Sequence, residues 1–227
     1  TMKRRQKRNM MLLGLILALH LIYILAGLGL RKAGIQLNLR WLFWNLGLAF
    51  MPVALAVPAY LLTSWRRHWG PISLGLAIGW LLFLPNACYM VTDLIHLQGS
   101  QLIGGNGVYL QSLSGWVRLI YIVGGILMAL VDGLFSTSLI HQNVKWRRNK
   151  VFNFCWMSVI SLLCGYGVYI GRFLRLNTWD VLQPKTLLLT LLQNIDKFTI
   201  LFSFMLAAFY FAAYLIFDKL MRSEPHA

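Results

Sequence analysis

The segment LPNACYMVTDLIHL, residues 84–97, places five hydrogen-bonding side chains, Thr92 among them, in an otherwise apolar stretch. Asn86, Tyr89, Asp93 and His96 are spaced i, i+3, i+7 and i+10, so on an α-helix they would lie within an arc of about 80°. A carboxylate that faced lipid would be costly. We therefore expect this polar face to look inward or into a water-filled vestibule.

Asp93 and His96 are the two groups in this segment that could take part in proton or metal chemistry. One helical turn apart, they could share a hydrogen bond or act as a general acid and base, because histidine titrates near neutrality. Two ligands do not make a catalytic zinc site, which usually has three protein ligands. We predict no metal site and assign no cofactor. A network that fixes helix packing remains an alternative to a catalytic role.

A second polar cluster follows another apolar run, in GYGVYIGRFLRLNTWD, residues 165–180. Arg172 and Arg175 are one turn apart, and each offers a planar fork suited to carboxylates and phosphates. Three further candidate binding residues follow them: Asn177, Trp179 and Asp180. Either one arginine pairs with Asp93 or Asp180 while the other reaches lipid headgroups, or both bind an anionic ligand beside the first polar face.

Asp132 is a carboxylate well inside an apolar segment, and an ionisable group in that setting is a candidate functional site. It lies about 12 Å from the inner end of its segment, and His20 lies at a similar depth in the first, at a rise of about 1.5 Å per residue. We predict that Asp132 contacts His20, or else a serine such as Ser158 or Ser161.

The elements that must position these residues are membrane-spanning helices. The chain has 227 residues, 59% of them hydrophobic, and a mean hydropathy of +0.65, which is too apolar for an ordinary soluble surface. A span needs roughly 20 apolar residues, and it is helical because its backbone groups find no water in hydrocarbon. Six segments qualify: about 10–30, 41–62, 71–92, 117–140, 151–171 and 198–217. We predict an all-α, six-helix membrane protein that forms a single domain over residues 1–227.

Charge sets the expected orientation of these spans. The net charge is +15, but the basic residues form short clusters between apolar runs. Clusters of this kind are typical of residues that fix the orientation of the spans and contact anionic lipid headgroups. We therefore expect lipid headgroups and not nucleic acid as the partner of the basic residues. With both termini in the cytoplasm, the inner segments hold 13 of the 21 Lys and Arg residues. The first apolar run is longer than a signal-peptide core, and we expect it to remain as a span.

Residues 186–197 have polar side chains at helical spacing opposite a leucine face, with Pro184 near the start. This pattern is typical of an amphipathic helix lying on the membrane surface. The alternative is an extension of the last span.

Two motifs in this chain are similar to those of a known family. LPNACYMVTDLIHL resembles LPNAPYxxTDLxHL of a bacterial family of multi-pass membrane proteins catalogued as a domain of unknown function, and GRFLRLNTWDVL resembles its second motif. The likeness runs from about the second to the sixth span and implies a bacterial inner-membrane protein. Carried over residue by residue, it points to Pro85, Asn86, Tyr89, Thr92, Asp93, His96, Gly171, Arg172, Arg175, Asn177, Trp179 and Asp180. Cys88 departs from the motif, which has proline there. The resemblance implies no activity.

Three classes of function fit these observations. The first is a protein that binds or transports a small ion or an anionic ligand at an outward-facing polar site. The second is a membrane-embedded enzyme for a lipid-linked or phosphate-bearing substrate, with Asp93 and His96 as catalytic candidates, although the sequence has no HExxH motif or phosphate loop. The third is a structural partner in a homo-oligomer or of another membrane protein. A site predicts polar groups converging on a cavity, whereas a packing role predicts that they are buried and mutually paired.

Overall fold

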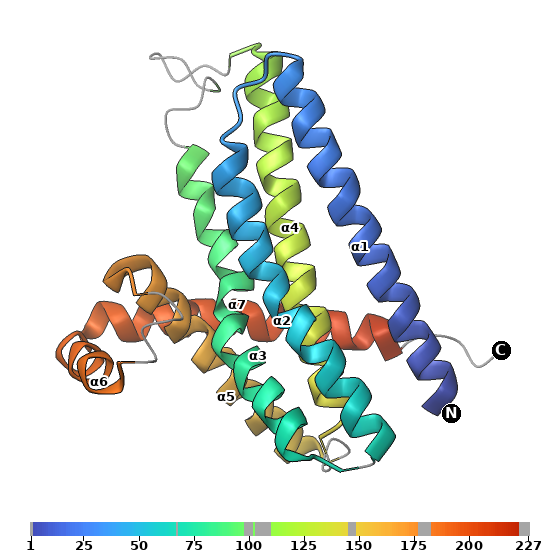
Figure 1. Ribbon diagram of the computed structural model, residues 1–227. Helices are drawn as coiled ribbons and strands as arrows, with labels where there is room; N and C mark the ends of the chain where they lie inside the picture. Colours follow the sequence, from blue (N-terminus) through green and yellow to red (C-terminus); the bar gives the residue numbers. More distant parts are fainter. Residues whose placement is uncertain are drawn as a thin grey trace.

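The computed structural model describes residues 2–66, 68–97, 102, 110–144, 149–176 and 183–222, and this part of the chain is almost entirely helical (Figure 1). The elements are α1 (Met2–Lys32), α2 (Leu39–Arg66), α3 (Pro71–Tyr89), the 3₁₀ helix η1 (Met90–Leu97), α4 (Leu113–Gln142), α5 (Lys150–Tyr169), the π-helical segment η2 (Ile170–Leu174), α6 (Pro184–Gln193) and α7 (Lys197–Arg222).

The prediction of an all-α protein with six potential spans is confirmed. Within the described residues, six helices are long and apolar enough to cross a membrane, namely α1, α2, α3 with part of η1, α4, α5 with η2, and α7. Large apolar side chains are exposed along α1 and α7. Such exposure is expected of helices that face lipid, because lipid tails replace the packing partners of a soluble core.

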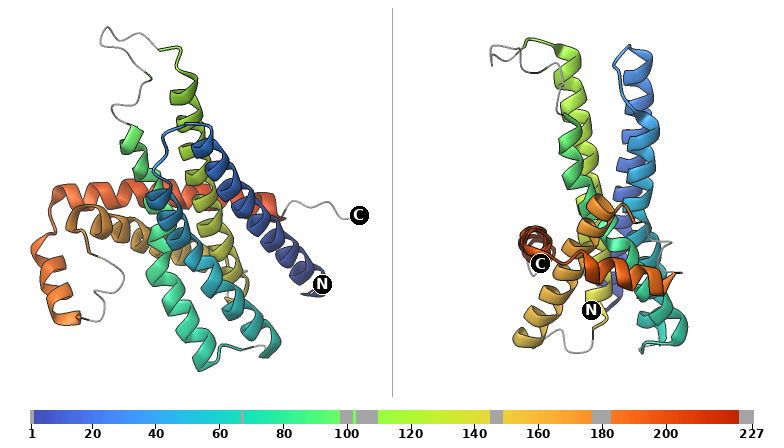
Figure 2. Two further views of the ribbon diagram at one scale, coloured as in Figure 1. Left: turned by 45° about the horizontal axis from the view of Figure 1, so that its top comes forward. Right: turned by 90° about the vertical axis from the view of Figure 1, so that its left-hand side faces the viewer.

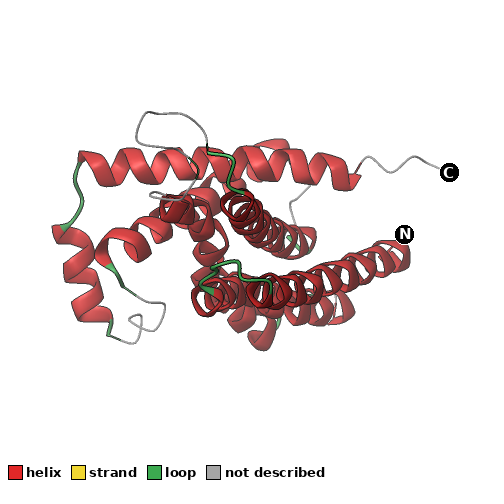
Figure 3. Cartoon of the chain, turned by 90° about the horizontal axis from the view of Figure 1, so that it is seen from above, coloured by secondary structure: helices red, strands yellow, loops and turns green. Residues whose placement is uncertain are grey.

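Helix α7 crosses the other helices steeply. In Figure 1 it runs across the group formed by α1 to α4, and the right-hand view of Figure 2 shows it nearly end-on. The view from above in Figure 3 shows α7 at full length beside the bundle. Gly165 of α5 allows this close crossing, since a Cβ there would meet the Ser203 carbonyl oxygen and the Ala207 nitrogen of α7.

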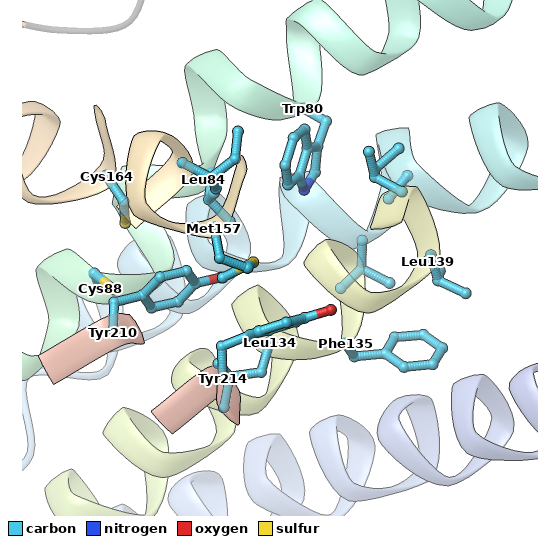
Figure 4. Packing of buried hydrophobic residues seen from close by; sticks show 14 of the residues in the cluster. Trp80, Leu84, Cys88, Leu134, Phe135, Leu139, Met157, Cys164, Tyr210 and Tyr214 are labelled. Atoms are coloured by element: carbon cyan, nitrogen blue, oxygen red, sulfur yellow. The ribbon is translucent and has the colours of Figure 1, made fainter. Parts of the chain in front are cut away.

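The main core lies where α2, α3, α4, α5 and α7 meet (Figure 4). Its largest fully buried side chains include Tyr210 and Tyr214 of α7. Both phenols are hydrogen-bonded to α4, Tyr210 to the Thr137 hydroxyl at 2.7 Å and Tyr214 to Nδ1 of His141 at 2.6 Å. Buried polar groups that find partners in this way fix which helix faces meet.

Helix α1 is joined to α4 by two tyrosines that exchange hydrogen bonds. The Tyr23 hydroxyl donates to the Tyr121 carbonyl oxygen at 3.0 Å, and the Tyr121 hydroxyl donates to the Tyr23 carbonyl oxygen at 2.8 Å. The rings stack with centroids 4.2 Å apart. Each hydroxyl lies against a glycine of the opposite helix, Gly125 and Gly27, where any Cβ would collide with it.

Residues 186–197 do not simply extend the last span. Helix α6 ends at Gln193, and α7 begins separately at Lys197. Asp196 caps α7, because its Oδ1 accepts hydrogen bonds of 2.7 Å from both the backbone N–H and the hydroxyl of Thr199. The alternative of one continuous helix is therefore wrong, while a surface position for α6 stays a prediction.

Candidate functional site

The two sequence motifs meet at an ion pair between Asp93 of η1 and Arg172 of η2. Nη2 of Arg172 lies 2.7 Å from Oδ1 of Asp93. The same guanidinium donates to the Thr92 hydroxyl oxygen, from Nη2 at 2.7 Å and from Nε at 3.0 Å. The Thr92 hydroxyl in turn donates to the Tyr89 carbonyl oxygen at 2.6 Å. We call Asn45, Tyr89, Thr92, Asp93 and Arg172 the Asp93–Arg172 cluster.

The other members of the cluster complete the pairing of both charges. Nδ2 of Asn45, on α2, donates to Oδ2 of Asp93 at 3.0 Å. The guanidinium carbon of Arg172 lies 4.5 Å from the centre of the Tyr89 ring, in a cation–π contact. The Asp93 side chain is 1% exposed and that of Arg172 is 19% exposed. Both carboxylate oxygens therefore have donors, as a buried charge requires.

Local changes in helix winding position this cluster. Helix α3 runs through Pro85 and ends at Tyr89, where the chain tightens into η1. A single α-helical face over residues 86–96 is thus wrong, because a 3₁₀ helix has about three residues per turn. Helix α5 widens into η2, which ends at Leu174 and is followed by Arg175 with a φ of 54°. Short π-helical segments are frequent at functional sites.

A cavity of about 510 Å³ lies beside the cluster, between α2, α3, α5, η2 and α6. Its polar lining comes from Asn45, Asn86, Tyr89 and Tyr166, and most of the remaining lining is leucine and other apolar side chains. Trp44, Leu82 and Leu163 line the cavity and are also exposed on the protein surface. The cavity is therefore rimmed by apolar side chains and has its polar groups next to the cluster.

The structure brings together five of the predicted site residues: Asn86, Tyr89, Thr92, Asp93 and Arg172. The expectation that one arginine pairs with Asp93 is confirmed for Arg172. Arg175 is exposed at the end of η2. The backbone of His96 belongs to η1, but its side chain lies outside the described residues. Asn177, Trp179 and Asp180 also lie outside them.

Asn45 is a member of the cluster that sequence reasoning missed. It lies in the second apolar segment, far from either motif, and no spacing rule connects it to Asp93. An amide within a membrane span is nevertheless a signal in itself, because such a group needs a partner in the protein.

The predicted contact between His20 and Asp132 is also confirmed. Nε2 of His20 lies 3.0 Å from Oδ2 of Asp132, and the Phe50 ring meets the imidazole edge with centroids 5.2 Å apart. The Asp132 side chain is 0% exposed and that of His20 is 14% exposed. Among the described residues, no group of three His, Cys, Asp or Glu side chains could hold a metal ion.

The six long apolar helices of the described residues are those of a multi-pass α-helical membrane protein. The family model described as "Protein of unknown function (DUF1361)" matches residues 44–213, and the chain therefore belongs to this family. That range includes both motifs and every residue that lines the cavity. No curated protein and no solved structure matches the chain.

Proposed function

We propose that the protein binds an amphipathic anionic ligand, of the class of membrane lipids, in the cavity beside the Asp93–Arg172 cluster. The observation that supports this most directly is the cavity itself, which combines an apolar rim with polar groups at one place. A lipid approaching from the bilayer would meet Trp44 and Leu82 first, and its chain would replace lipid contacts with protein contacts at little cost.

The polar groups of the cavity favour a headgroup at one end of the ligand. The amides of Asn45 and Asn86 and the phenol of Tyr89 can donate hydrogen bonds to phosphate or carboxylate oxygens. Asn86 now donates to the Phe83 carbonyl oxygen at 3.0 Å, and this local bond can be exchanged for one to a ligand. The exposed Arg175 precedes Leu176, which lines the cavity, so positive charge stands near the same region. Together these groups favour an anionic headgroup over a neutral one.

The geometry argues against two other functions of the motifs, namely a clamp for a small anion and acid–base catalysis. Arg172 is committed to Asp93 and Thr92, so it is not open to clamp a small anion together with Arg175. Both oxygens of Asp93 are engaged by Asn45 and Arg172, which favours a structural role for this carboxylate over acid–base catalysis. In our proposal the cluster fixes η1 against η2 and so keeps the cavity wall in place.

The distribution of basic residues supports a placement of this site in the cell. With both termini on the cytoplasmic side of a bacterial inner membrane, the cavity lies toward the outer leaflet. The ligand would then be drawn from that leaflet, and anionic headgroups would be the partners of the site.

The proposal is tested by lipid retention in native mass spectrometry and by thermal stability, with phosphatidylglycerol and phosphatidylcholine as probes. A specific ligand at a hundredfold excess over its Kd stabilises a protein by about 2.7 kcal/mol. We expect stabilisation by phosphatidylglycerol, its loss in Leu82→Trp, which fills the cavity, and its weakening in Asn86→Ala.

Ile78→Trp is the matched control, because Ile78 lies one turn before Leu82 on α3, is exposed, and is not part of the cavity lining. Equal stabilisation by phosphatidylglycerol and phosphatidylcholine would overturn the proposal that the headgroup is anionic. Equal behaviour of the two tryptophan variants would overturn the cavity as the binding site.

A further inference from the structure

The tautomer of His20 is set by its own helix. Nδ1 of His20 lies 2.9 Å from the Ile16 carbonyl oxygen, one turn earlier in α1. A carbonyl oxygen only accepts hydrogen bonds, so the ring hydrogen of a neutral His20 belongs on Nδ1. Nε2 of a neutral His20 is then an unprotonated, electron-rich nitrogen.

That nitrogen lies 3.0 Å from Oδ2 of Asp132. If Asp132 were ionised and His20 neutral, two atoms that each carry negative partial charge would repel at this distance. A proton removes the conflict in either of two ways. It can sit on Nε2, giving imidazolium and carboxylate, or on Asp132, giving imidazole and carboxylic acid. Both forms of the pair have no net charge.

In the part of the chain that the structure describes, His20 and Asp132 are the only charged partners of each other. The neighbouring side chains are all uncharged at neutral pH: Phe50 of α2 against the ring, Tyr23 of α1 and Tyr121 of α4 bonded to each other, and Ala87 of α3 and Tyr210 of α7 against Gly133. Both carboxylate oxygens of Asp132 and Nε2 of His20 are buried and make no aligned hydrogen bond among the described residues, so the 3.0 Å approach of Nε2 to Oδ2 is a close contact between the two groups. A carboxylate left alone in these surroundings would be expensive, which favours keeping the proton.

We propose that His20 and Asp132 form a proton-binding site in the membrane core, with a single exchangeable proton held between α1 and α4. This site is independent of the lipid cavity. Its second consequence is mechanical, because the other polar attachments of α1 to α4 are few: the Tyr23 and Tyr121 hydrogen bonds, and the bond of 2.9 Å that Nδ2 of Asn9 donates to Oε1 of Gln142. Loss of the proton leaves Asp132 charged beside a neutral imidazole and weakens the attachment of α1.

Infrared difference spectroscopy on the full chain in lipid nanodiscs tests the proposal. Spectra are recorded between neutral and alkaline pH, in H₂O and D₂O. We expect raising the pH to remove either the carboxylic acid band or the imidazolium bands, with an amplitude of one proton per chain. The signal should disappear in Asp132→Asn and also in His20→Gln, because each variant removes one side of the pair.

Two variants serve as controls. His68→Gln removes an exposed imidazole and Asp218→Asn removes a carboxylate near the end of α7, and both should keep the full signal. A parent protein that shows carboxylate and neutral imidazole throughout the pH range would overturn the proposal, as would a signal that survives in Asp132→Asn. If a variant fails to fold, solid-state NMR of the parent with ¹³C-aspartate and ¹⁵N-histidine decides the question, since it reports both protonation states directly.

Discussion

Removing the guanidinium of Arg172 should destabilise the protein far more than removing the guanidinium of Arg175. In Arg172→Gln the Asp93 carboxylate, 1% exposed, loses the Arg172 guanidinium and keeps the hydrogen bond from the Asn45 amide. Breaking a buried ion pair costs about 3–5 kcal/mol. Because Arg172 is 19% exposed and water can reach it, we expect a loss near the lower end, about 3 kcal/mol. The cation–π contact with Tyr89 is worth about 0.5–1 kcal/mol of that loss at a partly exposed site.

The assay is unfolding in mixed micelles of a mild detergent and dodecyl sulfate, followed by circular dichroism. Arg175→Gln is the matched control, because Arg175 is exposed and has no ion pair among the described residues. The double variant Asp93→Asn/Arg172→Gln should recover part of the stability, since it no longer buries a carboxylate that lacks its guanidinium partner, with a coupling of about 0.5–3 kcal/mol. Equal losses in the two arginine variants, or a double variant no better than Arg172→Gln, would refute the reasoning.

Three further outcomes are expected from the structure. Gly125→Ala should cost about 1–3 kcal/mol of stability in the same micelle assay, because the new Cβ collides with the Tyr23 hydroxyl, and the loss should shrink when Tyr23→Phe is added. Gly165→Leu should prevent the close crossing of α7 on α5, since the Cβ would meet backbone atoms that cannot turn aside; we expect little folded monomer by size-exclusion chromatography. Hydrogen bonds from the backbone N–H and hydroxyl of Thr199 hold the pKa of Asp196 below its ordinary value. The cap therefore stabilises α7 fully at pH values above the ordinary pKa of an aspartate, and this stabilisation is lost as the pH falls through the lowered pKa. Asp196→Asn keeps a capping side chain without a titrating group, and its melting temperature should therefore fall less steeply on acidification than that of the parent.

The architecture could be predicted because the signals that define it are long and local. A run of about 20 apolar residues requires a helix in a bilayer, whatever the rest of the chain does. The same reasoning located the deep pair, because an ionisable group in hydrocarbon needs a partner and His20 stands at a depth similar to that of Asp132. The angle at which α7 crosses α5 could not be predicted from the sequence, because it depends on the close approach of the α7 backbone to Gly165.

The site was predicted in its residues more fully than in its geometry. Asp93 and Arg172 stand out in sequence as charges at the ends of apolar runs, and their pairing follows from the cost of leaving either alone. The 3₁₀ winding of η1 and the π winding of η2 were not predictable, because each depends on packing between helices far apart in sequence. Asn45 and the buried His141 were missed for the same reason, since each finds its partner on another helix.

The two buried charge pairs differ in one chemical respect that separates their roles. Asp93 is held by a guanidinium, which keeps its charge at any physiological pH, and by the Asn45 amide. Asp132 is held by an imidazole, which gains or loses a proton near neutrality. The first pair therefore holds η1 against η2 at any physiological pH, and the cavity wall that it supports should keep its shape over that pH range. The second pair is weakened by removing a proton, so the response of the protein to rising pH should begin where α1 meets α4.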